Sequence, residues 1–374
     1  MDPLSWIDKP ASVRPGEELD REALAANLRD QFPDLDVSAI EVTQFRSGHS
    51  NLTYLLRLGE REMVLRRPPF GAKIKTAHDM LRESHILSHL IQVYPKVPRM
   101  LAYCGDETVM GVPFYLMERL RGVILRGSKS GNVEIPAEQM LAIAENFVDN
   151  LVEIHQVDYR AAGLGDLGRP QGYVKRQADG WTQRYFKART DDIPEMLVVA
   201  KWLAEHIPPG ADDTPDVGES MTAAALIHND YKYDNLVLDP EDLGVGKIIG
   251  VLDWEMATIG DPLMDLGTAL GYWIDPDDPP EMQAMNFGLT TLPGNLKRRE
   301  IAERYAQKSG RDLSNICFYY IFALFKIAVI IQQIYARYRA GYTTDERFAT
   351  FILAVGVLGI RAVQVINMGR IDNL

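Results

Sequence analysis

The stretch from residue 226 to residue 267 constrains this chain most, because it places polar side chains at fixed positions between apolar runs. His228, Asp230 and Asn235 lie in the segment HNDYKYDN, which follows the run ALI and precedes the run LVL. Asp253 ends a third apolar run, IIGVL. Because short apolar runs of this kind predict buried strands, we expect a loop between two strands, with a second aspartate at the end of the next strand.

The spacing of these side chains suits phosphoryl transfer. Asp230 and Asn235 are five positions apart and an aspartate follows on the next strand, as in a kinase catalytic loop. A carboxylate must orient the attacking hydroxyl, and Mg²⁺ prefers oxygen ligands. We therefore predict Asp230 as the catalytic base, Asn235 and Asp253 as Mg²⁺ ligands on the phosphates of ATP, and His228 as a brace of the loop. The alternative is an ordinary polar turn, since Asp and Asn favour turns.

Two more acids follow Asp253 in the sequence WEMATIGDPLMDLG. Glu255 faces the same side if the extended geometry continues, so it is a second metal ligand, a substrate contact or a solvated acid. Asp265 either caps the next helix or hydrogen-bonds the backbone of the catalytic loop. Because GDPLMDLG follows Asp253 directly, no activation loop intervenes, and a small-molecule substrate is favoured over a protein substrate.

A second constellation lies in the strand MVLRRPP and the helix that follows it. Strand alternation places Val64 and Arg66 on one face, so Val64 would line the adenine pocket and Arg66 would take the place of the phosphate-binding lysine of kinases. Glu83 shares the apolar face of a helix predicted over 76–90. An acid on such a face needs a partner, which favours an Arg66–Glu83 ion pair. The alternative is a glutamate that reaches water at the edge of the helix.

The remaining nucleotide contacts are inferred from position. The turn in RSGHSNLTY would cover the phosphates with backbone N–H groups, and its residues are Ser47, Gly48, His49 and Ser50. A plain hairpin turn is an equally good interpretation of this segment. The segment MERL would form the hinge that contacts adenine, through Met117, Glu118 and Leu120.

The order of predicted elements defines the fold class. A helix after the N-cap Asp20 is followed by three strands, a helix and two strands up to residue 120, and the rest is mainly helical. We therefore predict an α+β, two-lobed fold resembling protein kinases. Residues 1–37 would form an N-terminal arm and helix. Residues 38–120 would form a small lobe of antiparallel sheet plus one helix, and residues 121–374 a larger helical lobe with the catalytic loop.

Composition excludes several classes of function. The 374 residues carry a net charge of −12, which argues against a nucleic-acid partner. Two distant cysteines and an N-terminus without a signal peptide favour a reducing cytoplasm. The segment ICFYYIFALFKIAVIIQQIY (316–335) imitates a membrane span, but Lys326 interrupts it. Its uninterrupted apolar runs fall short of the roughly 20 residues a span needs, so we predict a buried helix and no membrane contact.

Several motifs carry a family resemblance that covers about residues 40–370. They include SGHSNLTY, VLRRPP, AHDMLRE, FYLMERLRG, KRQADGWTQRY, IHNDYKYDNLVLD, GVLDWEMATIGDPLMDLG and FALFKIAVIIQQIYAR. In these motifs the chain resembles the aminoglycoside/choline phosphotransferase family, and most closely the branch that includes the kinase-like domain fused to some acyl-CoA dehydrogenases. This resemblance implies ATP- and Mg²⁺-dependent phosphorylation of a small-molecule hydroxyl, with Asp230 as catalytic residue.

The acceptor is left open by the sequence. The loop YWIDPDDPPEM carries acids, Asp275 among them, that would suit a polycationic aminoglycoside. The segment KRQADGWTQRYFKAR carries Arg176 and four other cations around Trp181, which would suit an anionic acceptor such as a hydroxyacyl-CoA, although a basic segment is often just a solvated face. The alternative to an enzyme is a nucleotide-binding pseudoenzyme with a regulatory role, because the usual lysine is absent and the turn over the phosphates has a single glycine, Gly48.

Overall fold

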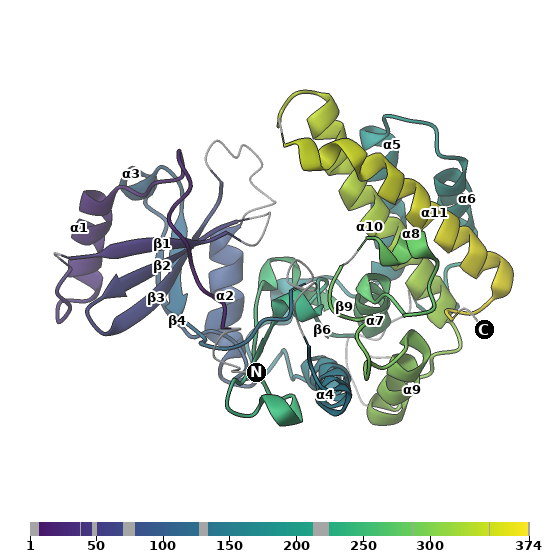
Figure 1. Cartoon of the computed structure of the whole chain (residues 1–374), viewed down its shortest axis with the longest axis horizontal. Coiled ribbons are helices and arrows are strands. Elements are labelled where there is room, and N and C mark those ends of the chain that lie inside the picture. The colour runs from purple at the N-terminus through teal and green to yellow at the C-terminus, as the bar shows by residue number, and fades with distance from the viewer. Residues whose placement is uncertain are drawn as a thin grey trace.

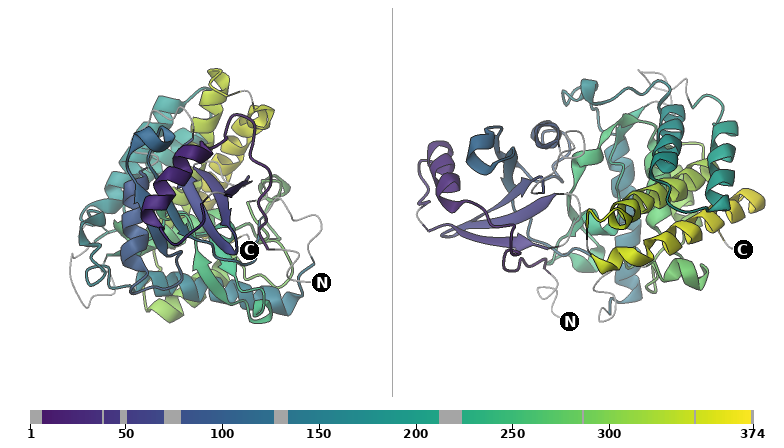
Figure 2. Two further views of the ribbon diagram at one scale, coloured as in Figure 1. Left: turned by 90° about the vertical axis from the view of Figure 1, so that its left-hand side faces the viewer. Right: turned by 90° about the horizontal axis from the view of Figure 1, so that it is seen from above.

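In a computed structural model the chain forms two lobes of different composition (Figure 1). The structure describes residues 7–37, 39–46, 51–69, 79–126, 134–211, 224–285, 287–343 and 345–372. The smaller lobe, on the left of Figure 1, contains the main β-sheet, and the larger lobe on the right is mainly helical. The same division is clear from above (Figure 2, right). The predicted α+β, two-lobed architecture is therefore confirmed.

The sheet of the smaller lobe has the strand order β1-β2-β3-β5-β4, and each neighbouring pair is antiparallel. All five strands fall in segments that the sequence predicts as strands. They are β1 (Glu41–Phe45), β2 (Leu52–Leu58), β3 (Arg61–Arg67), β4 (Met100–Cys104) and β5 (Phe114–Glu118). The pairing of β3 with β5 places the predicted hinge, at the end of β5, beside the strand that carries Arg66.

The two faces of this sheet bury different side chains, because successive strand residues point to opposite sides. On the inner face, Val64 joins a buried cluster that includes Ile86 and Leu87 of α2 (Met80–Leu90) and continues into the larger lobe. On the outer face, Leu65 packs in a second cluster with Leu28 of α1 (Arg21–Gln31). The alternation predicted for Val64 and its neighbours is therefore present.

The N-terminal part of the chain packs on the smaller lobe. Asp20 accepts hydrogen bonds from the backbone N–H groups of Glu22 and Ala23 and so caps α1, as predicted. Ala11 pairs with Gln44 of β1 in an isolated bridge, and α1 contacts the short α3 (Glu107–Met110). Residues 7–37 thus lie against the sheet, while the boundaries at residues 38 and 120 remain predictions.

Helix α2 begins later than the predicted residue 76. Asp79 accepts a hydrogen bond from the backbone N–H of Arg82 at 2.9 Å and caps the helix, which starts at Met80. An aspartate whose side chain accepts a hydrogen bond from the first helical turn is a strong helix start signal. The preceding residues 71–78, including Lys73, lie outside the described residues.

Two short antiparallel ladders hold the segment from 225 to 260 at the border of the lobes. Strand β6 (Ala225–Ile227) pairs with β9 (Thr258–Gly260), and β7 (Leu236–Leu238) pairs with β8 (Ile248–Val251). Between them lie the 3₁₀ turns η4 (Tyr233–Asn235) and η6 (Trp254–Met256). Each strand has only three or four residues, so the polar residues between them are brought close together.

The larger lobe is built from helices around one long buried helix, α10 (Ile316–Arg339). Its other helices and turns are α4 (Ala137–His155), η3 (Gly165–Leu167), α5 (Tyr173–Ala188), α6 (Pro194–Glu205), η5 (Leu243–Val245), α7 (Pro262–Tyr272), α8 (Pro280–Gln283), α9 (Arg298–Ser309), η7 (Glu346–Thr350) and α11 (Phe351–Met368). Helix α10 packs against α11, α7, α5 and α6, so it forms the centre of this lobe.

By length and composition alone, two of the described helical segments are apolar enough to cross a membrane, Ile316–Arg339 and Glu346–Met368. The apolar window of α10 is 72% buried, as a core helix requires, which agrees with the prediction. The window of the second segment is 33% buried. Helix α11 lies on the outer side of the lobe (Figure 2, right) and exposes apolar side chains such as Leu353, which is 68% exposed.

Candidate phosphoryl-transfer site

The loop after β6 is held by Asp265 of α7, a carboxylate that is fully buried. Its oxygens accept hydrogen bonds from the backbone N–H groups of His228 and Asn229, both at 2.7 Å. His155 of α4 lies 3.2 Å from the same carboxylate. Burial works to raise the pKa of Asp265, but the hydrogen bond from His155 and the nearby His228 outweigh it and leave the pKa below its ordinary value. Asp265 therefore stays charged and clamps the loop, which is one of its two predicted roles.

His228 braces the same loop from inside. Its Nε2 donates to the carbonyl oxygen of Leu252 at 2.9 Å, and its Nδ1 accepts from the backbone N–H of Asp230 at 3.2 Å. The ring is fully buried and packs edge-on against Trp254. Both ring nitrogens are occupied by backbone groups, so His228 connects the loop to the end of β8.

Asn229 adopts a left-handed backbone conformation with φ of 66°, which is uncommon for a residue other than glycine. Its side-chain amide donates to the carbonyl oxygen of Met256 at 3.0 Å and lies 3.3 Å from the hydroxyl of Tyr173 at the start of α5. The bend at Asn229 sets the direction in which the next residue, Asp230, leaves the strand. The sequence analysis missed this residue; an asparagine directly before the aspartate was its only signal.

Asp230 lies among groups that fix its carboxylate. Nζ of Lys232 is 2.9 Å from one oxygen and 2.8 Å from the other. Nδ2 of Asn235 donates to Oδ2 of Asp230 at 3.0 Å and to its carbonyl oxygen at 2.8 Å. Burial works to lower the pKa of Lys232, but Asp230 and Tyr272 outweigh it and hold the pKa well above its ordinary value, so the side chain remains an ammonium. Sequence reasoning also missed Lys232, a cation two residues after the predicted base.

Asn235 and Asp253 are placed at the same end of one ladder because β7 and β8 pair. The ladder sets Leu236 opposite Val251, and the backbone N–H of Leu252 donates to the carbonyl oxygen of Asn235 at 2.8 Å. Asp253 then turns with a left-handed φ of 69°. Both side chains offer hard oxygen donors, and among the described residues no group of three or more His, Cys, Asp or Glu gathers as a metal cage. Two oxygen ligands suit Mg²⁺, which is commonly held by one or two protein oxygens plus substrate phosphates.

The predicted ion pair between Arg66 and Glu83 is present, with Nη1 and Oε1 3.2 Å apart. The same guanidinium pairs with Asp253 through Nη2 and lies 3.3 Å from Glu255. Burial is the main cause that raises the pKa of Glu83, and Arg66 opposes it. Arg66 therefore joins the sheet, α2 and the end of β8 across the two lobes.

One of the three interpretations of the sequence made Glu255 a solvated acid, and this interpretation is wrong. Its side chain is 16% exposed and accepts a hydrogen bond from Asn51 at 2.6 Å, besides its contact with Arg66. Its backbone oxygen accepts from Arg82 of α2 at 3.0 Å. Glu255 thus lies on the side of the site that faces the smaller lobe.

The predicted adenine side of the site is formed by Val64 and Met117, which are opposite each other on β3 and β5 and both buried. The backbone N–H of Glu118 donates to the carbonyl oxygen of Arg99 at 2.9 Å, so an adenine contact at Glu118 would use its carbonyl oxygen.

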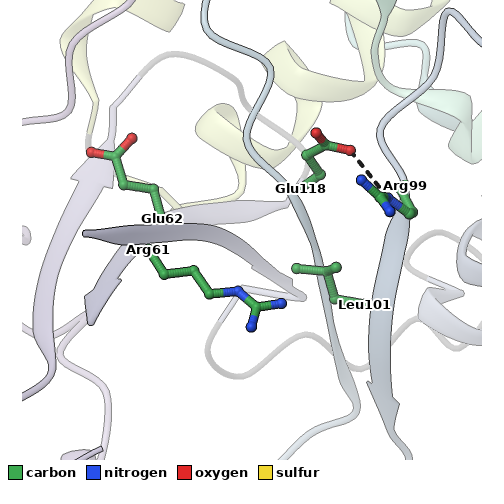
Figure 3. A pocket seen from close by; sticks show the side chains of 5 residues that line it. All are labelled: Arg61, Glu62, Arg99, Leu101 and Glu118. Atoms are coloured by element: carbon green, nitrogen blue, oxygen red, sulfur yellow. Dashed lines mark hydrogen bonds and ion pairs between the residues drawn. The ribbon is translucent and has the colours of Figure 1, made fainter. Parts of the chain in front are cut away.

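The Glu118 side chain pairs with Arg99 at 3.5 Å beside a shallow hollow of about 240 Å³ (Figure 3), lined by Arg61, Glu62, Arg99, Leu101 and Glu118.

The predicted phosphate-covering residues Ser47, Gly48, His49 and Ser50 lie outside the described residues. Leu120 is described and lies against the β7–β8 ladder, since a Cβ at Gly250 would meet its side chain. The hinge thus runs from β5 directly over the ladder that carries Asn235 and Asp253.

Helix α5 lies beside the loop of Asp230, since Tyr173 at its start contacts Asn229. Trp181 is buried, with the guanidinium of Arg184 4.6 Å from its ring centre and Nζ of Lys326 6.0 Å from it. Arg176 does not point freely toward a substrate; its guanidinium donates to the carbonyl oxygens of Arg169 and Gln171 and closes the turn before the helix. Arg176 therefore has a structural contact in this turn, and its predicted substrate role stays a prediction.

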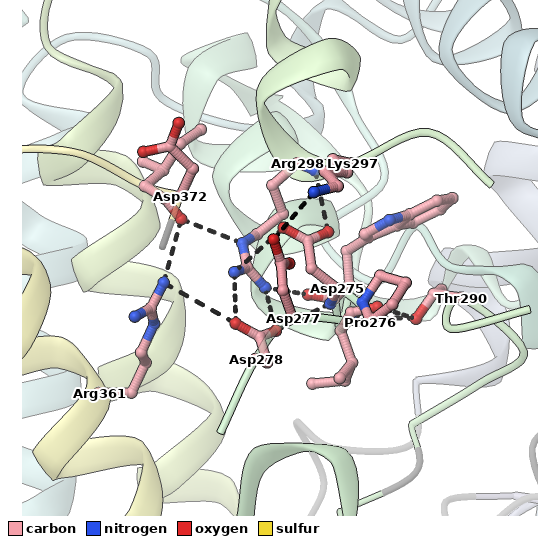
Figure 4. A network of polar contacts seen from close by, with 12 residues as sticks. Asp275, Pro276, Asp277, Asp278, Thr290, Lys297, Arg298, Arg361 and Asp372 are labelled. Atoms are coloured by element: carbon pink, nitrogen blue, oxygen red, sulfur yellow. Dashed lines mark hydrogen bonds and ion pairs between the residues drawn. The ribbon is translucent and has the colours of Figure 1, made fainter. Parts of the chain in front are cut away.

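Two acids of the loop proposed for a polycationic substrate, Asp275 and Asp278, are buried and lie beside Arg298 (Figure 4), whereas Asp277 is exposed and pairs with Lys297. Asp275 is 1% exposed, accepts a hydrogen bond from the backbone N–H of Arg298 at 3.0 Å and lies 3.2 Å from its guanidinium. Both terminal nitrogens of Arg298 donate hydrogen bonds to the carboxylate of Asp278, at 2.5 and 2.6 Å. Burial raises the pKa of Asp275 to about 6, against the lowering effect of Arg298. The prediction of Asp275 as a substrate residue is therefore wrong, because its carboxylate neutralises a buried arginine.

Comparison with known proteins gives this geometry its context. Residues 41–301 match the model of the phosphotransferase enzyme family. Acyl-CoA dehydrogenase family member 11 of Gallus gallus is 33% identical over 337 residues, which is 89% of this chain but 41% of that protein. The chain thus spans about two fifths of the length of this relative. A Ralstonia eutropha structure, itself assigned only provisionally as an aminoglycoside phosphotransferase, matches with a TM-score of 0.73 and 29% identity over 93% of this chain and 99% of that one.

A more distant structure has the same fold. It is a thermostable mutant of an aminoglycoside phosphotransferase in ternary complex with AMP-PNP and hygromycin B, with a TM-score of 0.56 and 16% identity over 91% of this chain and 98% of that chain. The two lobes, the loop of Asp230 and these matches define a kinase-like small-molecule phosphotransferase fold. The chain belongs to the phosphotransferase enzyme family, in the branch shared with the kinase-like part of acyl-CoA dehydrogenase family members 10 and 11.

Proposed function

We propose that the chain transfers the γ-phosphoryl group of ATP to a hydroxyl group of a small molecule, with Mg²⁺. The observation that carries this proposal is the convergence of Asp230, Lys232, Asn235 and Asp253 at one loop border, with the loop backbone held by Asp265. A carboxylate beside a lysine and an asparagine supplies a base, a cation and an oxygen ligand, which is what phosphoryl transfer needs.

Each residue of this site has one proposed role in phosphoryl transfer. Asp230 orients the acceptor hydroxyl and takes its proton as the acceptor oxygen bonds to the γ-phosphorus and the bond from that phosphorus to the leaving ADP breaks. Lys232, 2.8 Å from Asp230, stabilises the negative charge on the transferred group. Asn235 and Asp253 would hold Mg²⁺, which neutralises phosphate charge when it is bound. Arg66 reaches the same carboxylate from the smaller lobe and would contact the phosphates.

We infer that the acceptor is anionic and resembles a hydroxyacyl-CoA. Asp275 and Asp278 pair with the buried Arg298, and Asp277 pairs with Lys297. By contrast, Arg184 forms no ion pair among the described residues and lies over Trp181 beside the loop of Asp230. Relatives named acyl-CoA dehydrogenases support the same class. The aminoglycoside complex among the structural neighbours supports the alternative of a polycationic acceptor.

The experiment that tests the proposal is a screen for acceptor-stimulated ADP release with hydroxyacyl-CoAs, aminoglycosides and choline-like alcohols. Asp230→Asn should lower the rate with the best acceptor by at least about 10³-fold while ATP still binds. Asp242→Asn is the matched control, because Asp242 is half-exposed and pairs with Lys247 at the surface. A rate in Asp230→Asn equal to that of the control would refute the assigned role.

One observation favours a second candidate, a nucleotide-binding pseudoenzyme with a regulatory role. Arg66 stands in place of the usual lysine and its guanidinium pairs with Asp253, a proposed metal ligand. If this pairing prevents catalysis, the chain should bind ATP without any acceptor-stimulated turnover, and Asp230→Asn should change nothing. Turnover that depends on Asp230 would exclude this candidate.

A further inference from the structure

Lys326 is a buried cation in the middle of the apolar helix α10, and the proposed transfer chemistry does not use it. It is 3% exposed. Its Nζ donates to the backbone oxygen of Asn229 at 2.8 Å and lies 3.5 Å from Oγ1 of Thr268 on α7. An ammonium buried in an apolar helix is unfavourable for folding unless it is well paired. Its main partner here is a carbonyl oxygen of the catalytic loop and not a carboxylate.

The contacted residue is the bend that precedes Asp230. The N–H of Asn229 donates to the carboxylate of Asp265 at 2.7 Å, and its carbonyl accepts from Lys326. An anion and a cation therefore hold the two sides of one left-handed residue. Because the carbonyl of Asn229 belongs to the peptide bond that carries Asp230, rotation of that peptide would turn Asp230 away from Lys232 and Asn235.

We propose that Lys326 is a positioning residue that holds the Asn229 carbonyl and thereby aims Asp230 at the acceptor; this inference rests on the function proposed for Asp230. The side chains that flank Lys326 on α10, Phe325 and Ile327, carry no hydrogen-bond donor and cannot replace this contact. The bulk of α10 is fixed by its packing with α7 and α5, so the ammonium is anchored on the central helix of the lobe.

The charge on Lys326 depends on its surroundings. Burial lowers its pKa to about 8, Asp230 and Asp265 raise it, and Lys232 and Arg184 lower it further. The ammonium is therefore present at pH 7 and is lost as the pH rises above 8. A charge-assisted contact becomes an ordinary one over this range, which should weaken the hold on Asn229.

The test compares Lys326→Met with Gln332→Met. Gln332 is a matched control because it is buried on the same helix, with Nε2 3.0 Å from the carbonyl oxygen of Ala188 and 2.9 Å from Thr190, away from the loop. Lys326→Met should lower kcat at least tenfold, leave the KM for ATP within twofold and leave the Tm equal or higher. The wild type should lose kcat above pH 8, whereas Lys326→Met should show no such fall. Gln332→Met should keep kcat within twofold.

A second readout does not need activity. Hydrogen exchange followed by mass spectrometry should show at least tenfold faster exchange in the peptide containing His228, Asn229 and Asp230 of Lys326→Met, and no change there in Gln332→Met. Unchanged exchange, or equal losses of kcat and Tm in both variants, would overturn the positioning role. If the wild type transfers no phosphate but the exchange still differs, the positioning of the loop stands and the proposed function fails.

Discussion

At the scale of single residues, the contacts of Arg66 define the balance of charge in the proposed site. One guanidinium meets Glu83, Asp253 and Glu255, and it is almost completely buried. Three carboxylates around one cation leave the cluster with negative charge in excess. We expect a site of this kind to attract a divalent cation and to depend on Arg66 for its stability when no metal is bound.

We predict that Arg66→Met destabilises the protein by about 3–5 kcal/mol, because Glu83 is left as a buried charge without a counter-ion. Arg57→Met is the control, since Arg57 is half-exposed and its pairs with Glu41 and Glu62 should contribute about 0–1 kcal/mol. Urea unfolding measures both values. Adding Glu83→Gln to Arg66→Met should restore part of the loss, and equal losses in the Arg66 and Arg57 variants would contradict the role of the buried pair.

The pH dependence of stability should reveal Lys326. Its folded pKa of about 8 lies below the ordinary value of 10.5, so between these values the unfolded chain holds a proton that the folded chain lacks, and stability rises with pH. At pH 7 the buried charge costs about 3 kcal/mol, and Lys326→Met removes this cost but loses a hydrogen bond worth about 1 kcal/mol. The stability advantage of Lys326→Met over wild type should therefore shrink between pH 7 and pH 10, as measured by urea unfolding; a constant difference would refute the shift.

At the scale of secondary-structure elements, the crossing of α7 and α10 sets the position of the loop clamp. A Cβ at Gly267 of α7 would lie 2.5 Å from the carbonyl oxygen of Tyr319 on α10. The two helices therefore touch backbone to backbone, and this close approach carries Asp265 of α7 toward the loop and Lys326 of α10 toward the same loop. A glycine is required at this crossing because no side chain fits.

We predict that Gly267→Ala destabilises the protein by about 1–3 kcal/mol through overpacking and lowers activity by moving Asp265. Gly356→Ala is the matched control, because Gly356 lies in α11 with no atom within 4 Å of an added Cβ. That change should stabilise the helix by about 0.5–1 kcal/mol, since alanine favours helices more than glycine. Thermal unfolding measures the stability of both variants. If Gly267→Ala is as stable as Gly356→Ala, α7 and α10 can move apart to accept the extra methyl group, and the prediction is wrong.

The elements show why some features were predictable and others were not. Strands and helices follow from local periodicity, so β1 to β5 and α10 were expected close to their observed positions, and alternation alone gave the faces of Val64 and Arg66. The role of Asp275 could not be predicted, because an acidic loop is typical of a solvated segment. Its buried partner, Arg298, lies 23 residues later in the chain. The partners of Lys326 are equally non-local, since Asn229 lies 97 residues away. Such contacts depend on packing between distant segments and leave no local pattern.

At the scale of the whole molecule, the proposed site lies where the two lobes meet. The smaller lobe contributes Arg66 and the larger lobe contributes Asp253, and Arg82 of α2 adds a bond to the backbone of Glu255. Val123 also pairs with Leu238 of β7 directly after the hinge. A ligand that bridges these groups would hold the lobes together, so its binding should appear as a gain in the stability of the entire chain.

The last prediction uses this linkage to separate binding from chemistry. Mg·ATP at about 100 times its Kd should stabilise the wild type by about 2.7 kcal/mol, which for 374 residues corresponds to a rise in Tm of roughly 3 °C. Asp253→Asn should lose most of this rise, and removal of Mg²⁺ with EDTA should do the same in the wild type. Asp230→Asn should keep the full rise while losing transfer. If Asp253→Asn responds to Mg·ATP as the wild type does, Asp253 does not hold the metal, and Glu255, on the same side of Arg66, becomes the ligand to test next.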